Sequence, residues 1–157
     1  MNTALEKLAS DAGLANPENL HLRLAFGHAC VERIAHLLEQ APVIECLRLF
    51  GEYLGGKLEP AAFEQAQSDA LRLANGHRGS QSIDGCGHAA VSASYALANA
   101  INGRAPQAAS YAAYAAVYAD GGYGAVAQRE AFEPEFDWQV GALQALVARQ
   151  RQLACVG

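Results

Sequence analysis

The chain has 157 residues, a formal net charge of −5 and a composition that is 52% hydrophobic, much of it alanine. This length predicts one domain, residues 1–157, and the alanine content favours helices over strands. The acidic balance argues against a nucleic-acid partner, which needs a basic surface, and fits a soluble protein or one with a basic partner.

The cysteines also bear on the cellular compartment. Cys30, Cys46, Cys86 and Cys155 are widely spaced and form no C-x-x-C pair, which fits a reducing compartment better than a disulfide framework. The N-terminus has no basic stretch followed by an apolar run, so we expect no signal peptide. Residues 85–103 lack charge but contain alanine, serine and glycine rather than leucine, so we expect no membrane span. The sequence therefore predicts a cytoplasmic protein.

The chain begins with an amphipathic helix over 3–12, with Thr3 and Glu6 spaced as in a capping box. Residues 1–17 form this helix and a linker, and the main bundle spans 18–157. The next helix is expected over about 18–40. Its apolar arc contains Leu20, Leu24, Phe26, Cys30, Ile34, Leu37 and Leu38.

Arg23 lies inside this apolar arc at helical spacing. A buried arginine needs a carboxylate or several carbonyl groups to satisfy it. We expect Arg23 to be a structural buried charge that is paired with Asp69, Asp84 or Asp120.

The opposite face of the same helix carries His28, Glu32 and His36 at i, i+4 and i+8. This spacing can place three metal ligands on one face. The face has no H-E-x-x-H signature, however, and such a polar stripe is usually a solvated surface. We expect no metal site.

Two more helices follow, over about 43–54 and 60–77, with a loop from Asn75 to Ser82. Their expected inward residues are Ile44, Leu47, Phe50 and Leu54 in the first, and Phe63, Ala66, Ala70, Leu71 and Ala74 in the second.

The stretch 84–119 is the centre of the predicted fold. It holds two alanine-rich segments joined by Asn102-Gly103-Arg104-Ala105. Asp84 is a plausible cap, Gly103 suits a left-handed helix end, and Pro106 suits a first turn. We predict a tight helix hairpin at the centre of an all-α bundle of six or seven helices.

A flexible turn is expected over 120–124, and a last helix over about 134–153 with Phe136, Val140, Leu143 and Val147 on its core stripe. Trp138 points away from that stripe. It either fills a second packing contact or anchors a partner, as tryptophan often does at interfaces.

The first hairpin helix has a polar but nearly uncharged stripe of His88, Ser92, Tyr95, Asn99 and Asn102. In the second, Tyr111, Tyr114 and Tyr118 share one face. One interpretation is that the tyrosines pack in or near the core with their hydroxyls bonded. The other is that stripe and tyrosines form a recognition surface.

No G-x-S-x-G, P-loop or dinucleotide fingerprint occurs in the sequence. We expect no cofactor and no catalysis. The alternative is an enzyme or small-ligand binder whose polar pocket is lined by His88, Ser92, Tyr95, Asn99 and the tyrosines of the second hairpin helix.

Four segments together resemble the all-helical immunity proteins that accompany bacterial polymorphic toxins. They are LRLAFGHACVERIAHLLE (22–39), CGHAAVSASYALANA (86–100), AASYAAYAA (108–116) and FDWQVGALQAL (136–146). The family has a Trp-Gln pair before its final leucines, which is Trp138-Gln139 here. The chain departs from the family at Phe26-Gly27 and at Ser94.

The resemblance implies a cytoplasmic binding protein that neutralises a cognate toxin, and an acidic chain suits a basic toxin. A homo-oligomer is left open. The expected partner-binding surface consists of His88, Ser92, Tyr95, Asn99, Asp120 and Tyr123, with Trp138 as a further anchor.

Overall fold

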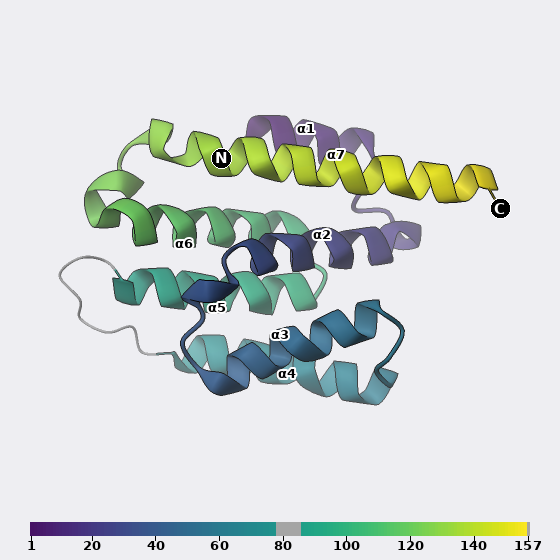
Figure 1. The fold of residues 1–157 in the computed structure, drawn as a ribbon, viewed down its shortest axis with the longest axis horizontal. Helices are drawn as coiled ribbons and strands as arrows, with labels where there is room; N and C mark the ends of the chain where they lie inside the picture. Colours follow the sequence, from purple (N-terminus) through teal and green to yellow (C-terminus); the bar gives the residue numbers. More distant parts are fainter. Residues whose placement is uncertain (78–85, 157) are drawn as a thin grey trace.

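The computed structural model describes residues 1–77 and 86–156, and the regular elements in these ranges are all helical (Figure 1). The α-helices in these ranges are α1 (Thr3–Asp11), α2 (Leu20–Arg33), α3 (Ala41–Leu54), α4 (Pro60–Gly76), α5 (Cys86–Ile101), α6 (Ala105–Val126) and α7 (Glu133–Val156). Three short 3₁₀ helices accompany them: η1 (Pro17–Asn19), η2 (Ala35–Leu37) and η3 (Arg129–Phe132). The predicted all-α bundle of six or seven helices is confirmed.

The predicted hairpin is formed by α5 and α6, which contact each other more extensively than any other pair of elements. Its turn depends on Gly103, whose φ of 76° lies in the left-handed region that glycine adopts without steric cost. Pro106 lies in the first turn of α6, where its missing N–H leaves no helical bond unmade.

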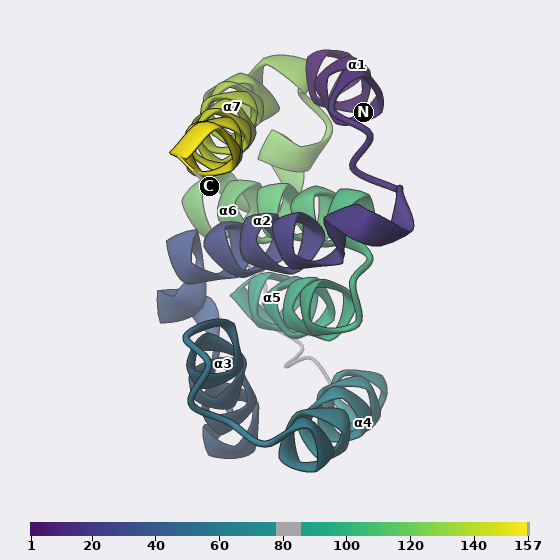
Figure 2. The same ribbon diagram turned by 90° about the vertical axis from the view of Figure 1, so that its right-hand side faces the viewer.

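The helices lie in tiers when viewed end-on (Figure 2). At one side α1 packs on α7, at the other α3 packs on α4, and α2, α6 and α5 lie between them. α5 is the central element, because it contacts α2, α3, α4 and α6. One core cluster draws on all seven helices, with Leu5, Leu22, Val43, Phe63, Leu97, Ala108 and Leu143 among its members.

The two hairpin helices are buried to different extents. Ala93, Leu97 and Ala100 of α5 are fully buried among four neighbouring helices. α6 buries its alanine face, whereas Tyr111 and Tyr114 on another face are exposed. Only part of α6 is therefore covered by the bundle.

α2 ends at Arg33, not at Gln40 as predicted, and continues as η2. No glycine or proline marks this end, so it has no local signal in the sequence. Three residues predicted to face inward are exposed instead: Leu20, Ile44 and Leu71. In each of these helices the apolar arc of the sequence is wider than the face that the helix buries. The exposed residue lies at the edge of that arc.

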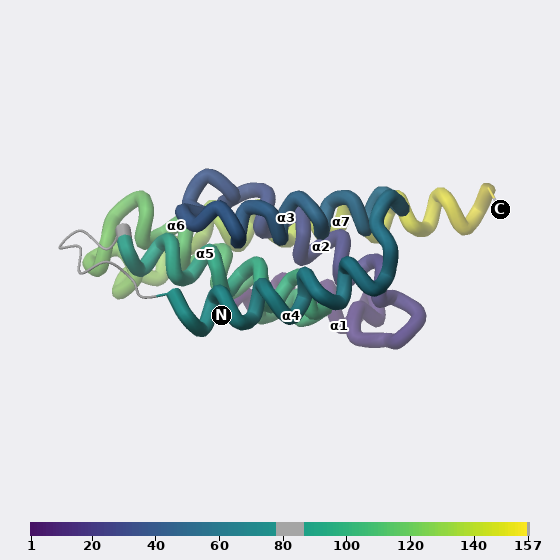
Figure 3. The backbone as a smooth tube through the Cα atoms, turned by 90° about the horizontal axis from the view of Figure 1, so that it is seen from below, coloured from purple at the N-terminus to yellow at the C-terminus, as the bar shows by residue number. Residues whose placement is uncertain are grey.

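The two ends of the chain lie in the same tier. The cap of α1 is Asn2, whose Oδ1 accepts from the Leu5 amide at 3.1 Å, so the predicted cap at Thr3 is wrong by one residue. α7 runs alongside α1, and its C-terminal turns extend past the other helices (Figure 3). The side chains beyond Val147 on α7 are exposed accordingly.

Arg23 is half-buried, and its Nη1 donates to the carbonyl oxygens of Leu14 at 2.8 Å and Asn16 at 2.7 Å. Among the described residues, no carboxylate lies within ion-pair distance of it. The predicted pairing with Asp69 or Asp120 is therefore wrong. The chain turns sharply before α2, which leaves carbonyl oxygens that need donors, and Arg23 supplies them.

Two predictions fall on residues 78–85, namely most of the loop after α4 and the cap at Asp84, and they lie outside the described residues. None of the helices that the structure describes is long and apolar enough to cross a membrane.

Candidate functional site

The tyrosines of α6 share one face because positions 111, 114 and 118 recur at helical spacing. Tyr111, Tyr114 and Tyr123 expose 39%, 43% and 47% of their surface. Such exposure is unusual for three large aromatic residues in one region, so this face differs from the rest of α6.

His88 of α5 lies between two of these rings. Its imidazole stacks on Tyr118 with ring centroids 5.4 Å apart and meets the edge of Tyr123 at 5.1 Å. Tyr118 and Tyr123 also contact each other edge to face at 6.0 Å. These contacts join the start of α5 to the end of α6.

Tyr95 forms a further aromatic contact about two turns along the hairpin from His88. Its ring stacks on Tyr111 at 5.4 Å, and its hydroxyl donates to Oδ1 of Asn75 on α4 at 3.1 Å. We call the resulting patch the tyrosine surface: it consists of His88, Tyr95, Tyr111, Tyr114, Tyr118 and Tyr123.

The other polar residues of the predicted stripe are less accessible to a partner than the tyrosines are. Ser92 and Asn99 are half-buried, and the Asn99 side chain donates to the Tyr95 carbonyl oxygen within its own helix at 2.8 Å. This bond uses one amide hydrogen for the helix itself, so Asn99 has less capacity for a partner.

A kink at Gly122 brings Tyr123 to the tyrosine surface. Gly122 has φ 63° and ψ −152°, a conformation that side-chain-bearing residues avoid. A turn is predicted over 120–124, and the chain does change direction in this range, at Gly122, with helical residues on both sides of the kink. The change in direction sets Tyr123 against His88.

Asp120 is exposed but does not join the tyrosine surface. It follows Tyr118 by two residues, which is about 200° around a helix. It therefore lies on the other side of α6, and within the described ranges it forms no ion pair.

Trp138 lies elsewhere, against the end of α2. The Arg33 guanidinium sits over its ring, 4.7 Å from the centroid, and Arg33 also donates to the Glu135 carboxylate at 2.8 Å. In the described parts of the chain, no ring contact connects Trp138 to the tyrosine surface. These contacts agree with the first of the two interpretations of Trp138, in which its side chain fills a second packing contact.

The histidine stripe of α2 does not stay on one helical face. His28 lies 3.4 Å from Glu32, but α2 ends before His36. Burial lowers the pKa of His28, and the Glu32 carboxylate opposes this only in part. No group of three or more metal-ligating side chains is found among the residues that the structure describes.

Three cavities formed by the described residues lie elsewhere, and none of these three is lined by His88, Ser92, Tyr95 or Asn99. The polar pocket of the small-ligand alternative is therefore not among them. The largest, about 610 Å³, lies between α1, α6 and the start of α7.

Sequence reasoning missed Gln139, which is 2% exposed and donates to the Ala109 carbonyl oxygen at 2.7 Å. A signal for its burial was present, because Gln139 is one helical turn from Leu143 on the core stripe.

Comparison with known proteins adds no relative to these observations: no family model, no curated protein and no solved structure matches the chain.

Proposed function

We propose that this protein binds another protein through the tyrosine surface and neutralises it, as an immunity protein neutralises its cognate toxin. The observation that carries the proposal is the exposure of Tyr111, Tyr114 and Tyr123 on one side of the hairpin. Tyrosine is enriched at interface hot spots because its ring gives contact area while its hydroxyl stays compatible with water.

The ring contacts within this surface also support binding. Tyr95 stacks on Tyr111, and His88 is held between Tyr118 and Tyr123. Rings that already contact one another lose little conformational freedom when a partner docks. The aromatic positions are therefore arranged before binding.

The charge of the chain favours a basic partner. Its net charge is −5. A net negative charge speeds the approach of a basic protein more than it strengthens the final complex. The toxin assignment rests on the family resemblance of the sequence, and a toxin that acts on nucleic acid would have the required basic surface.

The test is co-expression with the toxin domain encoded by the neighbouring gene, with bacterial growth as the readout. The wild-type chain should restore growth, and a Tyr111→Ala, Tyr123→Ala double variant should restore it much less. Circular dichroism of the double variant serves as the control for folding. If the wild-type chain does not restore growth, the immunity function is wrong; if the folded double variant restores it fully, the tyrosine surface is not the site.

A further inference from the structure

Two cavities meet between α1 and the first turns of α6. The larger has a volume of about 610 Å³ and the other about 590 Å³. Both are lined by Ala9, Leu14 and Pro106, so they adjoin at these residues, and we refer to the pair of cavities as the depression. Each is within the range of volumes that small-molecule sites have.

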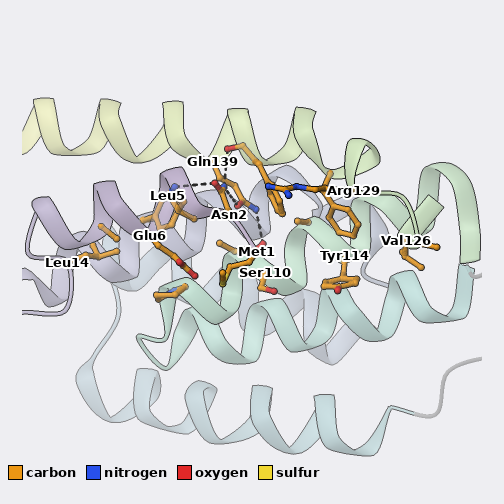
Figure 4. A pocket seen from close by; sticks show the side chains of 18 residues that line it. Met1, Asn2, Leu5, Glu6, Leu14, Ser110, Tyr114, Val126, Arg129 and Gln139 are labelled. Carbon is orange, nitrogen blue, oxygen red and sulfur yellow. Dashed lines mark hydrogen bonds between the residues drawn. The ribbon is translucent and has the colours of Figure 1, made fainter. Parts of the chain in front are cut away.

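The larger cavity is mainly apolar. Figure 4 shows its lining side chains converging from α1, α6 and α7. The apolar lining includes Leu5, Leu14, Phe26, Ala109, Ala113, Val126, Phe132 and Phe136. Glu6 and Arg129 contribute one charge of each sign, so the side chains give this cavity no net charge. It suits an uncharged, apolar chain.

The smaller cavity has the opposite character. Arg23 and Arg104 line it together with the polar residues Ser10, Asn16 and Gln107, and no carboxylate residue is in its lining. Neither arginine has a carboxylate within ion-pair distance in the described ranges. Two unpaired guanidinium groups in one cavity of an acidic protein favour an anion.

The Arg23 side chain is held in place by its own hydrogen bonds. Its Nη1 donates to the carbonyl oxygens of Leu14 and Asn16, both of which line the same cavity. A guanidinium has five N–H donors, so these two bonds leave others for a ligand. A fixed arginine loses less conformational entropy on binding than a free one.

We propose that the two cavities together bind an amphiphilic anion, a long-chain carboxylate, with its carboxylate at Arg23 and Arg104 and its chain in the larger cavity. The separation of charge and apolar surface in the depression matches the separation in such a ligand. Tyr114 belongs both to the tyrosine surface and to the lining of the larger cavity, so the two sites adjoin, whereas the smaller cavity with Arg23 and Arg104 has no residue of the tyrosine surface in its lining.

The test is calorimetric titration of the full chain with dodecanoate below its micelle concentration, in parallel with dodecanol and acetate. Dodecanoate should bind at least about tenfold more tightly than dodecanol, which has the chain without the charge, because a charge-assisted bond to arginine is worth that factor or more. Acetate, which has the charge without the chain, should bind too weakly to measure.

Two variants assign the parts of the ligand to the two cavities. Arg104→Gln should weaken dodecanoate about tenfold and leave dodecanol unchanged, because only the head group loses a partner. Ser110→Phe, at an exposed position lining the larger cavity, should weaken both ligands by filling the space of the chain. Arg149→Gln, at an exposed arginine of α7 outside both cavities, is the matched control and should change neither.

Equal affinity for dodecanoate and dodecanol, or no binding of either, would overturn the proposal. So would dodecanoate binding that Arg104→Gln and Ser110→Phe leave intact while circular dichroism shows both variants folded. A peptide with an apolar C-terminal segment is the rival occupant. If such a peptide binds at this depression more tightly than dodecanoate, the site takes a protein terminus and the fatty-acid assignment is wrong.

Discussion

Gln139 donates a hydrogen bond from its side-chain amide to the carbonyl oxygen of Ala109, 2.7 Å away in the interior. The same amide accepts from Asn2 at 3.3 Å through its oxygen. One side chain of α7 is therefore bonded both to the second turn of α6 and to the cap of α1. Because a buried amide is costly unless it is bonded, this pair fixes how the three helices meet.

Replacing this amide tests its contribution. Gln139→Leu should lower the free energy of unfolding by about 1–3 kcal/mol, since it removes both bonds, while Asn2 keeps its bond to the Phe136 carbonyl oxygen. Gln144→Leu, at an exposed position of the same helix, is the matched control and should change stability by less than about 0.5 kcal/mol. Urea unfolding measures the free energy of unfolding of both variants. Equal effects would show that the buried Gln139 amide contributes no more to stability than the exposed Gln144 amide.

Gly27 is a point of close approach between α2 and α5. A Cβ added there would lie 2.9 Å from the Cβ of Ala100, closer than such atoms approach. Gly27→Ala should therefore destabilise the fold by about 1–3 kcal/mol. A second change, Ala100→Gly, should restore part of this loss by reopening the space.

The control for this prediction is Gly141→Ala. Gly141 is an exposed helical position where an added Cβ meets nothing, so alanine should stabilise α7 by about 0.5–1 kcal/mol. Thermal unfolding of the variants would refute the close contact if Gly27→Ala and Gly141→Ala behaved alike.

His28 should make stability depend on pH. Its folded pKa is below the ordinary value of 6.5, because burial disfavours the charged ring. As the pH falls through 6.5, the unfolded chain takes up a proton that the folded chain does not, so the free energy of unfolding decreases. The decrease should end once the pH is below the folded pKa.

His28→Gln should flatten this part of the profile, whereas His36→Gln, at an exposed position, should leave the contribution of His28 in place. Denaturant unfolding between pH 5 and 8 measures the slope. An unchanged slope in His28→Gln would assign the dependence to another group.

Replacing Trp138 tests whether its side chain contributes to the packing of the fold or to partner binding. Because its ring lies under the Arg33 guanidinium against α2, Trp138→Ala should cost about 2–3 kcal/mol of stability. Its affinity for the partner should stay within about twofold of wild type, since this side chain is away from the tyrosine surface. A stable Trp138→Ala variant with greatly weakened binding would make the tryptophan an interface anchor instead.

Much of the fold could be predicted because its signals are local. The left-handed Gly103, the first-turn Pro106 and the alanine-rich segments each specify the hairpin within a few residues. The end of α2 at Arg33 could not be predicted, because Ile34 continues the helical period and only the packing of neighbouring helices ends it.

The candidate site could be predicted only in part. Helical spacing alone predicted that Tyr111, Tyr114 and Tyr118 share a face. In the structure Tyr111 and Tyr114 are exposed, and Tyr118 is half-buried against His88. That His88 lies between Tyr118 and Tyr123 depends on the register of the hairpin and on the kink at Gly122, which no local pattern specifies. The position of Arg23 inside an apolar arc predicted that it needs hydrogen-bond acceptors. These acceptors are the carbonyl oxygens of Leu14 and Asn16 and not a carboxylate, because the turn before α2 lies next to the guanidinium.

The affinity for a candidate toxin domain, sought among the adjacent genes, tests the proposed function most directly. Calorimetry should show tight binding by the wild-type chain, and Tyr111→Ala and Tyr123→Ala should each weaken it about tenfold or more, as truncated hot-spot tyrosines do. Leu71→Ala, which removes an exposed side chain of α4 with 40% exposure, should bind like wild type. If the folded tyrosine variants bind as tightly as Leu71→Ala, or if the wild-type chain does not bind the toxin domain, recognition through the tyrosine surface is contradicted.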